Sequence, residues 1–505
     1  MTFTEPMAAT LAKPRHSWLK RVNVAFVPGP MNAVVEQTIE GILAAFRSLG
    51  HTVQDRPDDH TSMIFTSARY GEAINWRKSL LLAGRVLLKL KRMPPVFTLV
   101  HMTRSEFHGI LGYLERALAK EPPDPEDFEF PGLAPSAFHV LVEQGRRGGP
   151  ILSLERILQA QTKSIRILLI VGDEKPEDVY HFDLVGAYPK SSASDPDFYE
   201  DIALRTITTV STHEVTDHQV VGELIPYDFW RSLSTPQAMR TAAQELGRRN
   251  FFTEMVQINR LVRVPAVENA VASQYSEGCF ATWEPALDAI IATITGSARP
   301  VDKDNITEDE LAILSGVRPG GIGAYVRHVE KKRNDPPSSE AVEMLEMDQA
   351  LPRVRLGAEW GIEKEVPVVR SKLHGHRGVY AYDPRFVEYT PLDPPYFHYL
   401  VSCATEAQAR AVKGAFSRSQ ALQNPEDPRQ LVFTILPGHG LVMAEKWVAG
   451  KAPFQLMWEY MDAGYIEIDS HVPQGPIEYV PDEDGRHVLH EVDPPLPRGD
   501  RNPVT

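Results

Sequence analysis

The sequence predicts an α/β protein in which two Rossmann-like, parallel-sheet units precede a strand-rich C-terminal domain. Three observations predict this fold class. Short β-branched runs alternate with longer stretches of helical periodicity as far as about residue 317. A Pro-rich acidic segment at 121–135 interrupts that alternation. Beyond residue 345 the pattern changes to β-branched and aromatic runs separated by turn residues.

The first α/β domain is expected at residues 21–120. "RVNVAFVPGP" (21–30) predicts a strand that ends at Pro-Gly-Pro, and the periodicity of "MNAVVEQTIEGILAAFRSLGH" (31–51) predicts the helix that follows it. "SMIFTSA" (62–68) and "PPVFTLVHMT" (94–103) predict further strands. Strands that alternate with helices imply a parallel sheet covered on both faces.

A second α/β domain is expected at 136–317. "IRILLIVGDE" (165–174) predicts a strand, and "TPQAMRTAAQELGRR" (235–249) and "WEPALDAIIATITG" (283–296) predict helices. The mixture of glycines, charges and prolines at 318–345 then favours a linker or mobile loop.

The strand-rich domain is expected at 346–490, as a barrel or sandwich with helical additions. "VPVVRSKLHGHRGVYAYD" (366–383) and "LVFTILPGHGLVMAEKW" (431–447) contain its clearest strand patterns. A flexible leader at 1–20 and a disordered tail at 491–505 are expected to flank the folded part.

Composition limits the classes of partner. A formal net charge of −14 argues against nucleic-acid binding, which needs a basic surface. No apolar run approaches the length of about 20 residues that a membrane helix requires. Only Cys279 and Cys403 are present, which is typical of a reducing compartment, and both are interpreted as buried small apolar residues. We expect a cytoplasmic protein with a small-molecule substrate, and a symmetric homo-oligomer is the default expectation.

"KLHGHRG" (372–378) is the first candidate site. In an alternating strand His374 and His376 would share one face, so both rings could reach one divalent ion such as zinc or manganese. The alternative is a pair of surface or turn histidines. Arg377 could position an anionic or polyhydroxylated substrate, or could pair with the acidic surface.

The second candidate site combines acidic residues of the middle of the chain. Glu277 precedes a predicted helix, and Asp302 and Asp304 follow it. In open α/β sheets such strand ends face the ligand crevice. The alternative is a purely structural role, with Glu277 as a helix-start acid and the aspartates as caps.

"TILPGHGLV" (434–442) places His439 between two glycines, where the backbone can approach another group closely, and His439 is an acid–base candidate. The sequence contains no G-x-S-x-G elbow, no H-E-x-x-H helix and no Cys-pair zinc knuckle, which argues against serine hydrolases and zincins.

The order of the three expected domains, together with "EGCFATWEPALDAIIATITGSARPVD" (277–302), resembles the L-fucose/L-arabinose isomerase family. The resemblance implies that Glu277 and Asp302 bind a manganese-like ion and that a histidine from the last third completes the set. It also implies aldose–ketose isomerisation through an enediol, with a carboxylate moving the proton. The short first domain and the "HGHRG" and "PGHG" elements depart from the family.

These patterns together predict a metal-dependent enzyme that acts on a small polar substrate, with a sugar or sugar phosphate as the carbohydrate class to test. Two alternatives remain. "GILAAFRSLGHTV" (41–53) resembles the first helix and strand of glycosyltransferases with two facing α/β domains. A non-catalytic sugar- or metabolite-binding protein could be built from the same units.

Overall fold

The computed structural model describes residues 22–73, 94–119, 138–139, 141–142, 149–161, 166–182, 187–210, 217–249, 251–252, 278–295, 303, 305–319, 323–393, 406–473 and 477–491, and all structural statements concern these residues. They fall into two compact units. The described part of unit 1 lies within residues 22–210, and that of unit 2 within 217–491.

Unit 1 is built on one sheet, sheet A, whose strand order is β2-β1-β3-β4-β5-β6-β7. Neighbours from β2 to β5 are parallel, and β6 and β7 add an antiparallel edge. The strands are β1 (Asn23–Val27), β2 (Thr52–Gln54), β3 (Met63–Ser67), β4 (Val96–Met102), β5 (Arg166–Val171), β6 (Asp178–Phe182) and β7 (Ala187–Ser192). The predicted α/β class is confirmed.

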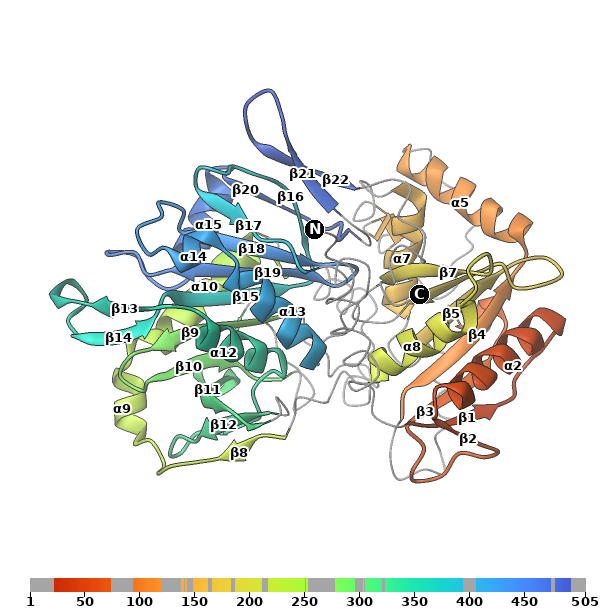
Figure 1. Ribbon diagram of the computed structural model, residues 1–505, viewed down its shortest axis with the longest axis horizontal. Coiled ribbons are helices and arrows are strands. Elements are labelled where there is room, and N and C mark those ends of the chain that lie inside the picture. Colours follow the sequence, from red (N-terminus) through yellow and green to blue (C-terminus); the bar gives the residue numbers. More distant parts are fainter. Residues whose placement is uncertain are drawn as a thin grey trace, which may run out of the picture. The chain divides into compact units, whose positions relative to one another are not determined.

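Helices cover both faces of sheet A, as Figure 1 shows. They are α2 (Ala33–Ser48), α3 (Tyr70–Ala73), α5 (Arg104–Leu118), α7 (Gly149–Gln161) and α8 (Phe198–Val210). Helices α2 and α8 pack together over an apolar cluster that includes Phe65 and Val179. The ring of Tyr180 contacts α5 through Phe107. Because successive strand residues point to opposite faces, α5 lies on the face opposite to α2.

The domain boundary expected at 121–135 does not separate two sheets. Strands β5, β6 and β7 follow it in the chain, yet β5 pairs with β4 in register from Phe97↔Arg166 to Met102↔Val171. A Pro-rich composition predicts a break in regular structure, whereas the pairing of strands on either side of such a segment depends on tertiary contacts that composition does not encode.

Unit 2 is built on sheet B, of strand order β17-β18-β19-β15-β9-β10-β11-β12-β8. Its pairs are antiparallel except for the two end pairs, β17 with β18 and β12 with β8. The strands are β8 (Gln219–Val220), β9 (Cys279–Glu284), β10 (Ala289–Thr293), β11 (Leu311–Val317), β12 (Ala324–Arg327), β15 (Val369–Gly375), β17 (Val387–Tyr389), β18 (Leu431–Leu436) and β19 (Gly440–Lys446).

Smaller sheets and helices complete unit 2. Strands β13 (Arg353–Leu356) and β14 (Lys364–Pro367) form a two-stranded sheet, and β20-β16-β22-β21 a four-stranded one. The latter strands are β16 (Gly378–Tyr382), β20 (Ile466–Asp469), β21 (Ile477–Pro481) and β22 (His487–Glu491). The helices are α9 (Tyr227–Ser232), α10 (Ser234–Arg248), α12 (Glu340–Ala350), α13 (Glu406–Ser417), α14 (Gln420–Gln423) and α15 (Gln455–Asp462).

Three expectations about the middle of the chain differ from this structure. The helix expected at 283–296 is a β-hairpin of β9 and β10, with Glu284 paired to Ala289. The segment 318–345, expected as a linker, contains β12 and the start of α12. Strands β8 to β11 belong to sheet B rather than to a second parallel sheet. An apolar run such as "AIIAT" satisfies helical and strand periodicity alike, and strand pairing decided the outcome.

Sheet B separates two different interiors. One face, called the α15 face, buries apolar side chains of the strands in one cluster with those of α10 and α15, and Leu373, Leu246 and Met457 belong to this cluster. The other face, called the α12 face, packs Ala281 and its neighbours against Leu345 of α12. Among the described residues, no helix combines the length and apolar character that crossing a membrane would require.

Candidate metal centre

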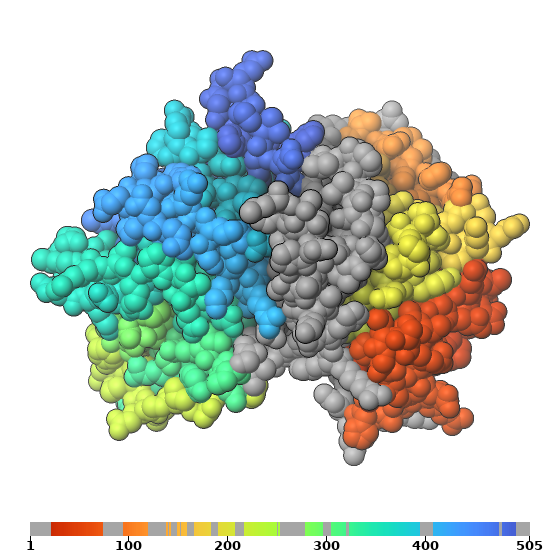
Figure 2. Space-filling model, viewed as in Figure 1, coloured from red at the N-terminus to blue at the C-terminus, as the bar shows by residue number. Residues whose placement is uncertain are grey.

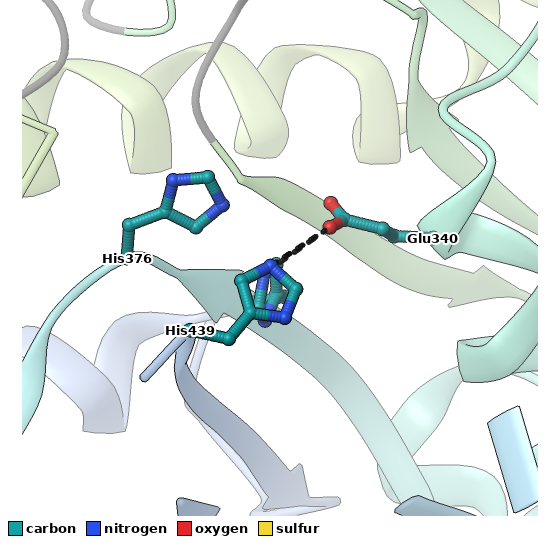
Figure 3. Close-up of side chains that lie close together, drawn as sticks. Glu340, His376 and His439 are labelled. Atoms are coloured by element: carbon teal, nitrogen blue, oxygen red, sulfur yellow. Dashed lines mark ion pairs between the residues drawn. The ribbon is translucent and has the colours of Figure 1, made fainter. Parts of the chain in front are cut away.

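Four buried side chains of unit 2 converge on the α12 face of sheet B. They are Glu340 at the start of α12, His374 in β15, His376 just beyond β15, and His439 in the turn between β18 and β19. One ligand atom from each lies within 4.8 Å of those of the others. Figure 3 shows His376 and His439 beside the Glu340 carboxylate.

Strand β15 positions the first two histidines. His374 is held between two neighbouring strands, opposite Val442 of β19 and Cys279 of β9. Side chains of positions two apart share one face of an extended chain, and the rings of His374 and His376 lie 5.4 Å apart between centroids. Both rings are buried.

The tight turn between β18 and β19 positions His439. Gly438 adopts a left-handed conformation with φ of 68°, and the backbone N–H of His439 donates to the carbonyl oxygen of Leu436 at 3.0 Å. A side chain at Gly440 would place its Cβ 2.1 Å from the carbonyl oxygen of Gly375, so glycine is needed there. The His439 ring consequently reaches to 4.7 Å from that of His374 and 5.0 Å from that of His376.

Helix α12 brings the carboxylate. Glu340 is its first residue, and its Oε1 lies 3.2 Å from Nε2 of His374 and 3.7 Å from Nε2 of His439. Negative charge is favourable at this end of a helix because the first backbone N–H groups point toward it. The position therefore suits an ionised carboxylate.

The hydrogen bond on the far side of the His374 ring defines which nitrogen faces Glu340. Nδ1 lies 3.0 Å from the carbonyl oxygen of Leu441. A carbonyl oxygen only accepts, so Nδ1 donates, and the neutral ring has its lone pair on Nε2. A lone pair and a carboxylate oxygen at 3.2 Å repel each other unless a proton or a metal ion lies between them. A backbone carbonyl behind the ring is also how metal-binding histidines are commonly oriented.

The electrostatics of the cluster keep Glu340 charged. Burial alone would raise the pKa of its carboxyl group, but His374, followed by His439 and His376, outweighs burial and holds the pKa below its ordinary value. A buried carboxylate needs positive charge nearby, which either imidazolium rings or a divalent ion can supply.

The donor set fits a transition-metal ion. Bonds of about 2.0–2.2 Å to imidazole nitrogen and carboxylate oxygen separate opposite ligands by about 4 Å, so small side-chain shifts bring four atoms now within 4.8 Å into coordination. Imidazole-rich sets suit zinc and its neighbours, whereas calcium and magnesium prefer oxygen. The Glu340, His374, His376 and His439 group can therefore hold a metal ion.

The structure thus brings together His374 and His376, predicted as ligands, with His439, predicted as an acid–base group. Arg377, the residue after His376, is partly buried. Glu277 and Asp302, the two predicted acidic ligands, lie outside the described residues. Glu340 was not selected from the sequence. The signal that could have found it is "PPSSEAVEMLEM" (336–347), where a Pro-Ser run leads into an acidic helix start.

A buried ion pair lies next to the cluster on the same α12 face. The Lys372 ammonium group is bonded to Asp348 of α12, and the two side chains are 0% and 4% exposed. Burial raises the pKa of Asp348 to about 6, although Lys372 opposes the change. The pair joins the end of α12 to β15, just as Glu340 and His374 join its beginning.

Cys279 has the surroundings expected of an unreactive thiol. It is buried, and burial raises its pKa to about 12. Thr293 Oγ1 donates to its sulfur at 3.6 Å. Cys403 lies outside the described residues.

No protein-family model matches the chain, and no curated protein is similar to it in sequence. The function is therefore argued from the geometry of the cluster.

Proposed function

We propose that unit 2 binds a divalent ion, with zinc first among the candidates, and that the protein is a metal-dependent enzyme acting on a small hydroxy-carbonyl compound. The observation that carries the proposal is the convergence of three buried imidazoles on the buried Glu340 carboxylate, with one ligand atom of each residue within 4.8 Å of the others. Three imidazoles around one carboxylate are what a transition-metal ion requires of a protein.

The reaction to test first is aldose–ketose isomerisation of a sugar or sugar phosphate. Glu340, His374, His376 and His439 would hold the ion, which when bound would polarise a substrate carbonyl oxygen and so make the adjacent C–H more acidic. Isomerisation then needs a group that takes a proton from one carbon and returns it to the next, and Glu340 is the carboxylate of the cluster. Arg377, which follows His376, supplies a cation suited to a phosphate or hydroxyl group of the substrate.

Metal content is the first experiment. We expect about one zinc, cobalt or manganese ion per chain in protein purified without chelators, and at least a hundredfold weaker binding in Glu340→Gln and His439→Gln, because even outer partners of a metal ligand are worth 10–100-fold. His487→Gln is the matched control, since His487 bonds to Tyr382 on another sheet. Equal metal content in all four proteins would remove the proposal.

Turnover is the second experiment. The metal-loaded protein is incubated with a panel of aldoses, ketoses and their phosphates, and products are separated by chromatography. We expect isomer formation that a chelator abolishes and zinc or manganese restores. Release of two smaller carbonyl compounds would replace isomerisation by carbon–carbon bond cleavage beside the same polarised carbonyl, because both reactions build negative charge on that oxygen.

A metal-loaded protein that binds sugars without changing them would favour the non-catalytic alternative. A nucleotide sugar that binds tightly and independently of the metal would favour the glycosyltransferase alternative, because that chemistry does not need the histidine cluster. The two experiments therefore separate the metal centre from the reaction assigned to it.

A further inference from the structure

A cavity of unit 2, separate from the metal centre, lies where the end strands of sheet B separate. β11 pairs with β12 as far as Ile313↔Arg327, and the pairing stops there. Val329 instead forms a bridge with Ile225 on the other side. The cavity between the diverging strands has a volume of about 230 Å³, and none of the four metal-centre residues lines it. Figure 1 shows β11, β12 and β8 at this end of the sheet.

Side-chain bonds fix the loop that closes the cavity. Asn334 donates to the carbonyl oxygen of Val329 and accepts from its backbone N–H, each at 2.9 Å. Lys332 Nζ donates to the carbonyl oxygens of Leu311 at 2.6 Å and Arg333 at 3.0 Å. These bonds tie the loop both to itself and to β11, so the cavity is a built part of the fold.

The polar lining is positively charged. Arg327 and Lys332 contribute two cations, and the carboxylate of Asp335 is bound by Arg333, which is not part of the lining. Burial lowers the pKa of both His218 and His328. Both rings are therefore neutral at pH 7. The Asp335 carboxylate is shared with Arg333, so it does not fully offset the two cations of the lining.

His218 supplies a neutral donor. The backbone N–H of Ala324 donates to its Nδ1 at 3.2 Å, so the neutral ring carries its proton on Nε2. Arg327 donates to the carbonyl oxygen of Leu287 at 3.4 Å, which uses one of its five N–H groups. Both groups donate hydrogen bonds, which is the chemistry that recognises a carboxylate.

The rest of the lining is apolar. It consists of Val220, Leu311, Ala312, Ile313, Val326, Val329, Pro336 and Pro337. A cavity of about 150 Å³ holds a benzene molecule, so this one has room for an acid of roughly eight to ten non-hydrogen atoms. Val220 is 52% exposed, and atoms of this part of the chain, yellow-green in Figure 2, reach the surface of the unit, so a ligand can reach the cavity from solvent.

We propose that this cavity binds a small organic carboxylate, with its apolar body against the aliphatic wall and its carboxylate group against Arg327 and His218. Cations without an apolar wall would suit inorganic phosphate equally well, and an apolar wall without cations would suit a neutral molecule. The combination selects an acid with a hydrocarbon body. This site is independent of the metal centre and of the reaction proposed there.

The test uses benzoate as the probe and the full-length protein. Histidine ring signals of His218 and His328 are followed by NMR while benzoate, benzamide or inorganic phosphate is added. We expect saturable shifts with benzoate and at least tenfold weaker binding of benzamide and phosphate. Benzamide that binds as tightly as benzoate would remove the role of charge, and phosphate that does so would remove the role of the apolar wall. Either result overturns the proposal, as does the absence of saturable shifts.

Two arginine variants localise the site. Arg327→Gln should weaken benzoate binding at least tenfold. Arg355→Gln removes the same charge from an exposed position on β13, where Arg355 is 74% exposed, and should change binding less than twofold. A urea denaturation midpoint equal to that of the parent protein shows that each variant is folded. Equal effects of the two substitutions would mean that benzoate responds to overall charge, which contradicts a built site.

Discussion

The two faces of strand β15 differ in what they bury. On the α15 face, Leu373 packs within an apolar cluster. On the α12 face, the residues on either side of it, Lys372 and His374, meet Asp348 and Glu340. One strand therefore borders a hydrophobic core on one side and buried ionisable groups on the other.

The difference shows which buried side chains of β15 stabilise this unit and which do not. Burying a leucine side chain contributes about 1.5–3 kcal/mol. Burying a charged side chain costs several kcal/mol of desolvation free energy, and the attraction of its partner at best compensates for this cost. The apolar contacts of β15 on the α15 face therefore stabilise the unit, whereas its buried charged groups on the α12 face add little net stability. Five predictions test this division, in order of expected size.

Breaking the buried ion pair should have the largest effect. Lys372→Met leaves the Asp348 carboxylate buried without its partner, which should lower the free energy of unfolding by about 3–5 kcal/mol. Urea denaturation measures the loss. A loss below about 1 kcal/mol would show that water reaches Asp348 and that the α12 face is not a dry interior.

Truncating the apolar face should cost slightly less. Leu373→Ala removes three buried carbon atoms from the apolar cluster that contains Met443 and Met457, and it should lower the free energy of unfolding by about 2–5 kcal/mol. Metal content should stay at the parent level, because the substitution points away from the four ligands. Loss of the metal in this variant would show that the two faces are not independent.

The pH dependence of stability should reveal Glu445, a buried ionisable residue on the otherwise apolar α15 face. Glu445 is buried there and accepts from the backbone N–H groups of Phe454 at 2.9 Å and Leu456 at 3.0 Å, where α15 begins. Burial raises its pKa to about 7, although Phe454 opposes the change. The folded state therefore favours the protonated acid, and this contribution to stability is complete below the ordinary pKa and is lost as pH rises through about 7.

The expected size of this loss is about 3 kcal/mol. Denaturation curves at pH 5 and pH 8 should differ more for the parent protein than for Glu445→Gln, whose side chain does not titrate. A Glu445→Gln variant with the same pH dependence as the parent would contradict the assignment to this group.

Metal removal should destabilise the protein through the residues of the α12 face and not through those of the α15 face. Zinc at a hundredfold excess over its dissociation constant should raise the free energy of unfolding by about 2.7 kcal/mol. Glu340→Gln should lose most of this gain, because it removes the carboxylate among the three imidazoles. The control is Leu373→Ala, which should respond to zinc as the parent does, and thermal unfolding with and without zinc measures both.

Replacing the whole ion pair should have the smallest effect. In Lys372→Met/Asp348→Leu neither partner is left buried and charged, so stability should lie within about 1 kcal/mol of the parent. A double variant as unstable as Lys372→Met would mean that the pair contributes through packing geometry rather than through charge compensation.

The sequence predicts the fold class because strand patterns survive in the chain itself. The runs around Phe97, Leu168 and Val442 are β-branched or apolar and became β4, β5 and β19. The number of sheets is not encoded in the same way. Sheet A joins strands on both sides of the Pro-rich segment, and sheet B takes strands from both sides of the expected linker, since pairing is decided by contacts distant in sequence.

The candidate site likewise contains residues that local spacing predicts and one residue that only distant contacts place there. The two-residue spacing of His374 and His376 is local, so alternation along a strand predicts their common face. Glu340 is 34 positions before His374 (374 minus 340), and it joins them only because α12 packs on the α12 face. A first-turn glutamate is ordinary in any helix, so its sequence gives no sign that three histidines will surround it.

The first and last members of the cluster, Glu340 and His439, are 99 positions apart (439 minus 340), and among the described residues strands β13 to β18 lie between them in the chain. Such distant groups meet only late in folding, after the costly closure of a long loop. Metal uptake by a newly made chain should therefore follow sheet assembly instead of guiding it. The rate at which an ion is captured would then serve as a clock for the final stage of maturation.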